Sequence, residues 1–201
     1  MTHIWAGEFG DEYTRRNRAK SEDDIGRRAM WSMLLPSDLK SVLEVGANVG
    51  KNLAAISRLS EAELFASEPN ELAREELAEL VSPQNIRADY CDHLFFPDGV
   101  ADLVITCGVL IHISAARLVP SMKELHRCSR RWIISAEYFA PSEEMVPYRG
   151  KHDALWRRDY GSIWLDNFPD LQCYAAVFAW KRMTGLDNLT FWVFEKGNKR
   201  H

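Results

Sequence analysis

One short stretch near residue 45 constrains the fold more than any other part of the chain. An apolar run from Val42 to Val45 contains one acid, Glu44, and leads into the loop GANVG at residues 46–50 and then the helix-like residues 51–56. Glycine tolerates unusual backbone angles and adds no side chain, so such a loop lets the backbone approach a ligand closely. The free N–H groups at the start of the next helix face the same place. This strand, loop and helix therefore predict a site for a nucleotide-like cofactor.

Composition narrows the class of protein. The chain has 201 residues, of which 46% are hydrophobic, enough for one α/β domain with a proper core. Its net charge of −4 and pI near 5.9 disfavour a nucleic-acid polymer or an anionic membrane as partner. No apolar run approaches membrane-spanning length, and the polar first residues are unlike a signal peptide. We therefore expect a cytoplasmic protein.

The cysteines and histidines give no sign of a metal centre. Cys91, Cys107, Cys128 and Cys173 are scattered without a C-x-x-C pair, which disfavours a disulfide framework or a structural zinc site. No cluster of histidine and acidic residues has the spacing of metal ligands. We predict no metal, and a reducing compartment.

Strands and helices are predicted to alternate along the chain. The predicted helices are residues 11–20, 21–35, 52–59, 70–81 and 115–128, and the predicted strands are 41–45, 63–67, 85–88, 101–106 and 131–136. This rhythm is typical of a parallel sheet with crossover helices. Residues 138–168 read as irregular, and two strands, 171–180 and 189–195, follow as an antiparallel hairpin joined by residues 181–188.

We therefore predict an α/β fold: a doubly wound, mostly parallel seven-stranded sheet with a C-terminal antiparallel hairpin. One domain spans residues 1–201, with an N-terminal helical cap at 1–36 and a substrate-side insertion at 137–168.

Three classes of cofactor compete for the glycine loop. A dinucleotide site requires G-x-G-x-x-G, and no third glycine follows Gly50 at that spacing. A phosphate-binding P-loop requires Ser or Thr after the lysine, but Asn52 follows Lys51 and the upstream glycine is one position short. S-adenosylmethionine has no pyrophosphate, so the loop need only accommodate its ribose and amino-acid end. Glu44 can then help to hold the ammonium group.

Acidic residues follow the second and third predicted strands. Glu68 lies at the end of the second strand, beside the glycine loop, where a carboxylate can accept both ribose hydroxyls. An enzyme that uses NAD would have this acid too, and a solvated glutamate at a helix start is the plain structural alternative. Asp89 follows the third strand, where it can accept from an adenine amino group.

Together these motifs resemble the class I S-adenosylmethionine-dependent methyltransferases. The ordered set is the glycine loop, Glu68, Asp89, the strand DLVIT at 102–106 and the segment GVLIHI at 108–113, and the resemblance covers roughly residues 40 to 195. It implies a Rossmann-like fold whose last strand is antiparallel, with S-adenosylmethionine as cofactor. The expected cofactor-binding residues are Tyr13, Asn17, Glu44, Gly46, Ala47, Asn48, Glu68, Pro69, Asp89, Tyr90, Cys107 and Gly108.

One residue of the loop departs from that family's pattern. Asn48 stands where many methyltransferases have the middle glycine. Asparagine tolerates a positive φ better than other non-glycine residues, so the loop can keep its shape. Its amide is also available to contact the cofactor.

A narrower resemblance concerns the acceptor. Residues 5–17 (WAGEFGDEYTRRN), 136–138 (AEY) and 146–150 (VPYRG) are similar to the methylases associated with pseudaminic-acid and related surface-sugar gene clusters. This resemblance implies a small, polar, sugar-like or amino-acid-like acceptor without naming one.

Candidate catalytic residues follow the fourth and fifth strands. Glu137 and Tyr138 come directly after the strand at 131–136, at the sheet edge where chemistry occurs in such folds. Glu137 is a candidate general base or a partner for an acceptor ammonium. The ordinary pKa of His112 suits proton transfer, although a packed, hydrogen-bonded histidine is an equal interpretation.

Two further segments supply candidate lid and substrate residues. Tyr13, Arg16 and Asn17 fall at spacings that share one helical face, as a lid over the cofactor with Arg16 reaching an acceptor carboxylate, or as a plain amphipathic helix. The aromatic and basic residues of the second segment suit an anionic, hydroxylated molecule, or else anchor a surface loop. These substrate candidates are Tyr148, Arg149, His152 and Arg157.

The resulting hypothesis is methyl transfer from S-adenosylmethionine to an oxygen or nitrogen of a small polar metabolite. An NAD-dependent or nucleotide-sugar oxidoreductase is the alternative enzyme, although the chain lacks a Tyr-x-x-x-Lys pair suited to it. A non-catalytic cofactor-binding partner in a biosynthetic complex, and a methyltransferase acting on RNA, are further alternatives. Both a monomer and a homodimer remain open.

Overall fold

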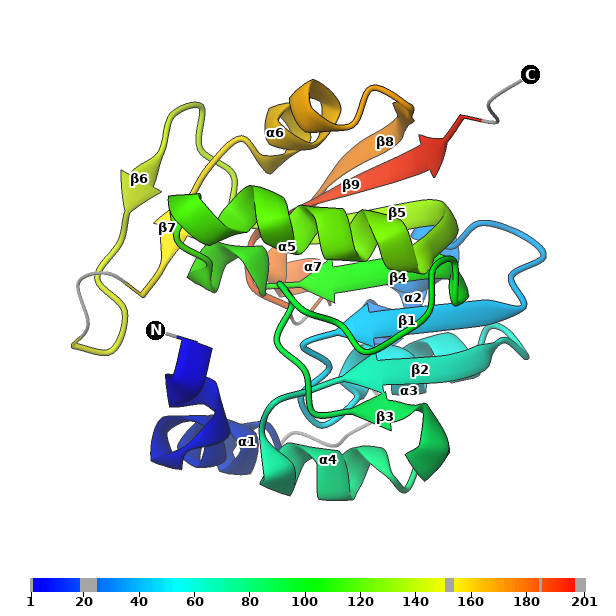
Figure 1. Cartoon of the computed structure of the whole chain (residues 1–201), viewed down its shortest axis with the longest axis vertical. Helices are drawn as coiled ribbons and strands as arrows, with labels where there is room; N and C mark the ends of the chain where they lie inside the picture. Colours follow the sequence, from blue (N-terminus) through cyan, green and yellow to red (C-terminus); the bar gives the residue numbers. More distant parts are fainter. Residues whose placement is uncertain (1, 19–24, 151–153, 185, 198–201) are drawn as a thin grey trace.

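The computed structural model describes residues 2–18, 25–150, 154–184 and 186–197. Its centre is a seven-stranded sheet of order β3-β2-β1-β4-β5-β9-β8 (Figure 1). The strands are β1 (Ser41–Val45), β2 (Glu63–Ser67), β3 (Ile86–Arg87), β4 (Ala101–Cys107), β5 (Ser129–Glu137), β8 (Leu171–Ala179) and β9 (Leu189–Lys196). Strands β1 to β5 pair in parallel, and β9 is antiparallel to both of its neighbours.

Helices cover both faces of this sheet. In Figure 1, α5 lies in front of the sheet, whereas α2 and α3 lie behind it. A short ribbon of β6 (Glu144–Met145) and β7 (Trp156–Arg157) stands apart from the sheet. The helices are η1 (Thr2–Ala6), α1 (Glu8–Arg18), α2 (Ile25–Leu34), α3 (Lys51–Ser57), α4 (Glu71–Leu77), η2 (Pro83–Asn85), η3 (Leu110–His112), α5 (Ala115–Cys128), α6 (Tyr160–Asn167) and α7 (Lys181–Thr184).

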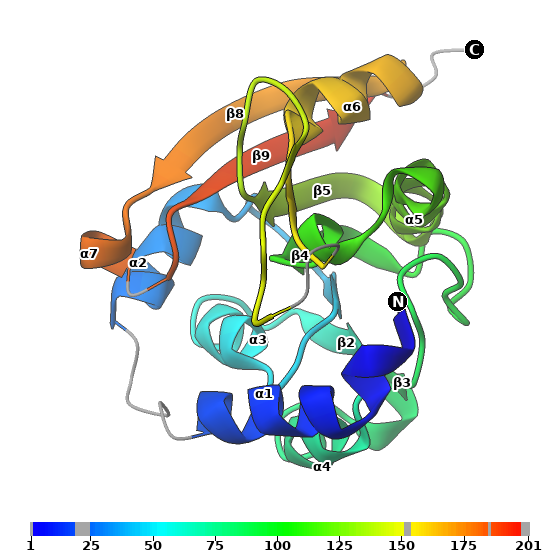
Figure 2. The same ribbon diagram turned by 90° about the vertical axis from the view of Figure 1, so that its left-hand side faces the viewer.

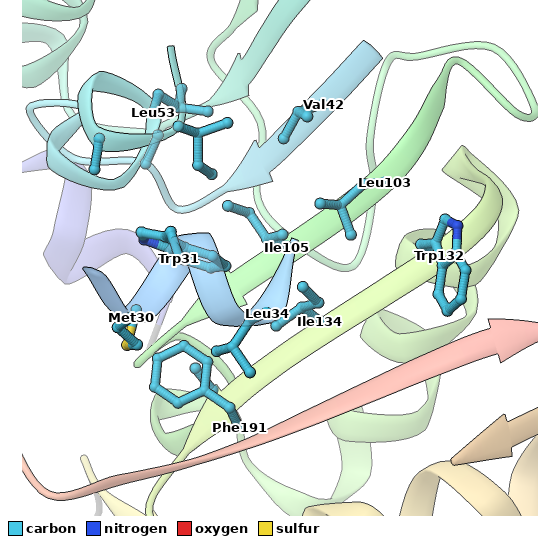
Figure 3. Close-up of a cluster of buried hydrophobic side chains, with 14 of the residues drawn as sticks. Met30, Trp31, Leu34, Val42, Leu53, Leu103, Ile105, Trp132, Ile134 and Phe191 are labelled. Carbon is cyan, nitrogen blue, oxygen red and sulfur yellow. The ribbon is translucent and has the colours of Figure 1, made fainter. Parts of the chain in front are cut away.

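The central strands are apolar because both of their faces are covered. Every residue of β1 is buried, and β4 is buried over most of its length. Parallel strands between two helix layers read as continuous apolar runs for this reason. The core behind the sheet places Trp31 of α2 against Ile105, Ile134 and Phe191 (Figure 3). The core in front is built around α5 and α6.

The N-terminal helices have two different positions. Helix α2 belongs to the core, since Met30, Trp31 and Leu34 are buried there. Segments η1 and α1 instead lie near the ends of the strands and against α4 (Figure 2). Within the part of the chain that the structure describes, no helix is long and apolar enough to cross a membrane.

The fold-class prediction is confirmed, and several element bounds match it. The strands at 41–45 and 63–67 and the helix at 115–128 have the predicted limits. The predicted helix at 70–81 is shorter, because α4 ends at Leu77 and 3-10 and turn structure follows. The predicted end of the first helix, at residue 20, and the predicted start of the second, at residue 21, lie outside the described residues.

The prediction that residues 138–168 are irregular was wrong for α6. Asp159 caps this helix, because its side chain accepts a hydrogen bond of 3.0 Å from the Ser162 N–H. The helix buries Tyr160 and Trp164 against the sheet. Residues 181–188, predicted as a connection, likewise contain the short helix α7.

The contact between α6 and the sheet predicts the effect of one added methyl group. A Cβ on Gly161 would lie 2.3 Å from Nε1 of Trp192. We expect Gly161→Ala to lower the free energy of unfolding by about 1–3 kcal/mol through overpacking. Urea denaturation measures this change. Gly7→Ala is the matched control, since no atom lies within 4 Å of a Cβ at that position; equal stability of the two variants would contradict the packing described here.

Candidate active site

A cavity of about 730 Å³ lies at the C-terminal ends of the parallel strands. This volume is within the range of small-molecule pockets, roughly 300–1,000 Å³. Every residue that was predicted to bind the cofactor lines it: Tyr13, Asn17, Glu44, Gly46, Ala47, Asn48, Glu68, Pro69, Asp89, Tyr90, Cys107 and Gly108. Residues separated by almost a hundred positions therefore meet at one place because parallel strands end at one edge of the sheet.

The glycine loop has the left-handed backbone that its sequence predicted. Gly46 has φ 75°, Asn48 φ 48° and Gly50 φ 75°. The N–H groups of Gly46 and Ala47 donate to the carbonyl of Ser67, which ties the loop to the end of β2. A Cβ on Gly46 would lie 2.5 Å from a methyl carbon of Val109, so this position leaves no room for a side chain.

Glu68 joins the glycine loop to the start of α4. One carboxylate oxygen accepts from the Asn48 N–H at 2.8 Å, and the other accepts from the Asn70 N–H at 2.9 Å. The side chain is buried, so the alternative of a solvated helix-start glutamate does not hold. Burial raises the pKa of Glu68, and the two N–H donors act in the opposite direction.

Glu44 is the second buried carboxylate of the cavity. Its Oε1 accepts from the Asn52 side-chain amide at 2.7 Å, and Arg27 donates to the Oδ1 of the same amide. Its Oε2 is buried and has no hydrogen-bond partner among the residues that the structure describes. Burial raises the pKa of Glu44 to about 8, although Asn52 and Arg27 act in the opposite direction.

Asp89 and Tyr90 form the end of the cavity beyond β3. Asp89 is buried, and its Oδ2 accepts from the Phe95 N–H at 2.8 Å. Burial raises the pKa of this carboxyl. Its position follows from the bond of Ser67 Oγ to the Asp89 carbonyl, which fixes the chain after β3 to the end of β2.

Helix α1 is attached to the glycine loop and to α4 by side-chain hydrogen bonds and by an ion pair of Arg18 with Glu76. Asn17 donates to the Oδ1 of Asn48 at 2.9 Å, and the Asn48 amide donates to Thr14 at 3.2 Å. Thr14 donates in turn to Asn70, whose amide donates to Asp11. The three residues that the sequence offered as a lid, Tyr13, Arg16 and Asn17, all line the cavity.

His112 faces the cavity from η3, and one neighbour determines which of its ring nitrogens carries the proton. Its Nδ1 lies 2.6 Å from the carbonyl of Ala154, and a carbonyl only accepts, so Nδ1 carries the proton. Burial lowers the pKa of His112 to about 4, so the ring is neutral at pH 7 and Nε2 holds a lone pair. The rings of Trp5 and Tyr148 lie 4.7 and 5.1 Å from the imidazole.

Tyr138 also lines the cavity, at the end of β5. Its hydroxyl donates to Asp187 at 2.8 Å, and Lys181 donates to the other oxygen of the same carboxylate. Burial and the neighbouring Asp187 raise the pKa of Tyr138, so its phenol stays protonated. The connection between β8 and β9 thus contributes to this wall of the cavity.

Glu137, predicted as a catalytic residue, does not line the cavity. It is fully buried, and its oxygens accept from the Thr106 hydroxyl and from the N–H groups of Leu110 and Ile111. These donors belong to the end of β4 and to η3, the segment that carries His112. The geometry gives Glu137 the position of a support beneath η3.

The predicted substrate residues separate into two groups. Arg16, Tyr148 and Arg149 line the cavity, whereas Arg157 does not. Arg157 is exposed on β7 and lies 3.9 Å from Glu144. His152 lies outside the described residues.

Some cavity residues were not predicted. Trp5, Arg27, Asn52 and Asp187 line the cavity, and they come from η1, α2, α3 and the β8–β9 connection. Asn52 had a usable signal, since it lies eight positions after Glu44 on the helix that follows the loop. Arg27 and Asp187 had no such signal in the sequence, because only the packing of α2 and of the β8–β9 hairpin brings them to this edge of the sheet.

Thiolate and metal chemistry find no support in the described residues. Burial raises the pKa of Cys107 to about 12, so its thiol stays protonated. Among the described residues, no group of three or more His, Cys, Asp or Glu side chains is placed to hold a metal ion.

The side chains of the cavity fit S-adenosylmethionine. The unpartnered Oε2 of Glu44 matches an ammonium group, because a buried acceptor without a donor is costly. Gly46 lines the cavity without a side chain, so a ligand can approach the loop backbone closely. Glu68 lines the cavity at the adjacent strand end, a position from which a carboxylate can accept from a ribose diol.

The raised pKa of Glu44 predicts a pH dependence of stability. A carboxyl with a folded pKa of about 8 contributes stability that is complete below its unfolded pKa, about 4.3, and is lost as the pH rises through 8. We expect the wild-type free energy of unfolding to fall over this range, and to fall less in Glu44→Gln, which resembles the protonated acid. Urea denaturation at a series of pH values measures both slopes. Parallel profiles would show that Glu44 does not titrate as described.

Comparison with known proteins identifies the fold. Residues 43–131 match the model of a family described as methyltransferase domain. No curated protein sequence matches the chain significantly. Many solved structures do match. One is the 1,6-didemethyltoxoflavin-N1-methyltransferase of Burkholderia thailandensis, crystallised with 1,6-didemethyltoxoflavin and S-adenosylhomocysteine; it is 14% identical, with a TM-score of 0.75, and 98% of this chain and 89% of that chain are covered.

Two further structures are equally distant in sequence. The magnesium protoporphyrin IX methyltransferase of Synechocystis PCC 6803, with bound S-adenosylmethionine, is 16% identical, with a TM-score of 0.65 and coverage of 97% of this chain and 94% of that one. Phosphoethanolamine N-methyltransferase 1 of Haemonchus contortus is 15% identical, with a TM-score of 0.65 and coverage of 93% and 48%. The chain thus has the Rossmann-like fold of S-adenosylmethionine-dependent methyltransferases, and residues 43–131 are similar to a methyltransferase domain.

Proposed function

We propose that this protein transfers a methyl group from S-adenosylmethionine to an oxygen or nitrogen of a small polar metabolite. Residues 1–201 act as one domain, in which η1 and α1 cover the cavity and residues 137–168 provide part of the acceptor side. One observation carries the proposal: the cofactor-binding residues expected from the sequence all line a single cavity, which continues to His112, Tyr138 and Tyr148.

The cofactor would be held at three strand ends. Glu68 at the end of β2 binds the ribose, and Asp89 with Tyr90 binds the adenine. Glu44 and the loop from Gly46 to Asn48 bind the amino-acid end. When bound, S-adenosylmethionine supplies an electrophilic methyl carbon on a sulfonium. The protein then has to orient the acceptor and exclude water.

His112 is the proposed general base for a hydroxyl acceptor. The Ala154 carbonyl fixes the proton on Nδ1, which leaves Nε2 to take the proton of an acceptor hydroxyl. The phenol of Tyr138 orients the acceptor from the neighbouring strand. Glu137 acts through η3 as a positioning residue, since it binds the N–H groups of Leu110 and Ile111.

The lid excludes water from this side of the cavity. The rings of Trp5 and Tyr13 pack edge to face, with centroids 5.4 Å apart, and Trp5 also contacts His112. A tight aromatic cover keeps solvent from the reacting atoms.

The acceptor is proposed to be sugar-like or amino-acid-like. Support comes from the resemblance of residues 5–17, 136–138 and 146–150 to the methylases associated with pseudaminic-acid gene clusters. The fold alone does not select an acceptor, because the similar structures are named for a toxoflavin precursor, a magnesium porphyrin and phosphoethanolamine.

Calorimetric titration tests the cofactor, with S-adenosylhomocysteine as ligand and NADH in parallel. Binding of S-adenosylhomocysteine alone is expected. Binding of NADH alone would favour an oxidoreductase. Binding of S-adenosylhomocysteine without methyl transfer to any supplied sugar, amino acid or phosphate ester would favour a non-catalytic partner.

Replacing Glu68 tests the ribose site. We expect Glu68→Ala to weaken S-adenosylhomocysteine binding roughly 10- to 100-fold, because hydrogen bonds to a charged group contribute about 1.5–3 kcal/mol. Calorimetry measures the affinity, and circular dichroism checks the fold. Glu71→Ala is the matched control, since Glu71 is an exposed acid outside the cavity lining. Unchanged affinity in Glu68→Ala would remove the main support for this site.

Replacing His112 tests the general base. With an alcohol acceptor, we expect His112→Gln to lower kcat by about 10²- to 10⁴-fold while S-adenosylhomocysteine affinity stays the same. The wild-type rate should rise through about pH 4, the pKa of His112, and then level off. His126→Gln is the control, since His126 pairs with Asp170 outside the cavity. An unchanged kcat in His112→Gln would exclude it as the base.

A further inference from the structure

We propose that Arg149 forms an anion subsite that binds a carboxylate or phosphate group of the methyl acceptor. This inference deepens the proposed function and rests on it, because the bound anion belongs to a methyl acceptor only if the protein transfers a methyl group. It assigns to the acceptor one negative charge, held at the edge of the cavity that faces the β6–β7 ribbon.

The charge of Arg149 is not neutralised by a described acid. Its guanidinium lies over the ring of Tyr148, 5.5 Å from the centroid, and no carboxylate pairs with it among the residues that the structure describes. Nearby cations differ in this respect. Arg157 lies 3.9 Å from Glu144, Arg158 donates to Glu143 at 2.6 Å, and Lys181 donates to Asp187.

The backbone holds Arg149 in an unusual conformation. Its φ is 50°, and the φ of Gly150 is 78°. A left-handed conformation is unfavourable for a non-glycine residue, because its Cβ crowds the backbone. Such a conformation is commonly retained where a side chain must be placed for function, and here the residue lines the cavity.

A row of aromatic rings connects Arg149 to the proposed base. Tyr148 stacks under the guanidinium on one side, and its ring centroid lies 5.1 Å from that of His112 on the other. The Trp5 ring follows, 4.7 Å from the imidazole. The ring of Phe9 in α1 lies 6.3 Å from that of Tyr148, so the connection between β6 and β7 meets α1 at this row.

Charges of both signs line the cavity, among them Arg16, Arg27, Lys51 and the pair of Lys181 with Asp187. The carboxylates Glu44, Glu68 and Asp89 follow β1, β2 and β3. Arg149 lies beside the aromatic row, at the part of the cavity assigned to the acceptor. A guanidinium binds an oxyanion through two parallel N–H groups, which also orients the molecule. The acceptor class is thus a small hydroxy acid, amino acid or sugar phosphate, with its anion close to the atom that is methylated.

Two simple anions test the subsite. We would titrate inorganic phosphate and acetate, at constant ionic strength, into protein saturated with S-adenosylhomocysteine, and follow the phosphorus and methyl resonances by NMR. The same titrations would be made with Arg149→Ala and with Arg157→Ala, an exposed cation of the same ribbon outside the cavity. Urea denaturation would check that both variants fold.

The expected result is that the wild type and Arg157→Ala bind an anion, and that Arg149→Ala binds it at least about tenfold more weakly. Binding of phosphate alone supports a phosphate ester as acceptor, and binding of acetate alone supports a carboxylic acid. If neither anion binds to the wild type, or if Arg149→Ala binds as well as the wild type, the inference is wrong. Failure of the proposed function is seen separately, as absence of S-adenosylhomocysteine binding, and titrations without that ligand still report on the subsite.

Discussion

The burial of the Glu68 carboxylate between two backbone N–H groups is the constraint on which the site depends. The donors belong to Asn48 in the glycine loop and Asn70 at the start of α4, so one side chain fixes two loops relative to each other. A buried carboxylate is costly unless donors satisfy it. The loop can supply its N–H only in the left-handed conformation of Asn48, which explains why an asparagine serves where glycine is common.

The same two asparagines hold the lid. The side chain of Asn48 bonds to Thr14 and Asn17, and the side chain of Asn70 bonds to Thr14 and Asp11. The backbone N–H groups of both asparagines donate to Glu68. Asn70 also caps α4 through the Ala73 N–H. The elements around the cofactor region thus form one connected network, in which loops, helix cap and lid share residues.

The sheet and the cofactor region could be predicted from the sequence because their signals are local. Apolar runs such as Val42–Val45 mark buried strands, and Glu68 and Asp89 directly follow their strands. Rules of parallel topology then place those ends together. Glu137 satisfied the same rule, yet its side chain turns into the core, since a position after a strand does not fix which way the side chain points.

The acceptor side of the cavity was harder to predict, because its residues are brought together by tertiary packing and have little local sequence signal. Helix α6 contains Gly161 and aromatic residues and lacks a clear helical period. Its only local sequence signal is the capping pair of Asp159 and Ser162. Arg27 and Asp187 reach the cavity through the packing of α2 and of the β8–β9 hairpin. Such contacts depend on the tertiary fold, and no local pattern contains them.

The attachment of the lid has a kinetic consequence. A movement of α1 away from the cavity breaks the bonds of Asn17 and Thr14 to Asn48 and also separates Arg18 from Glu76 of α4. Asn17, Thr14 and Asn48 are uncharged, whereas salt screens the partly exposed pair of Arg18 and Glu76. In the function proposed here, the dwell time of the spent cofactor would then depend mainly on the neutral bonds and only weakly on ionic strength, because a surface ion pair contributes about 0–1 kcal/mol.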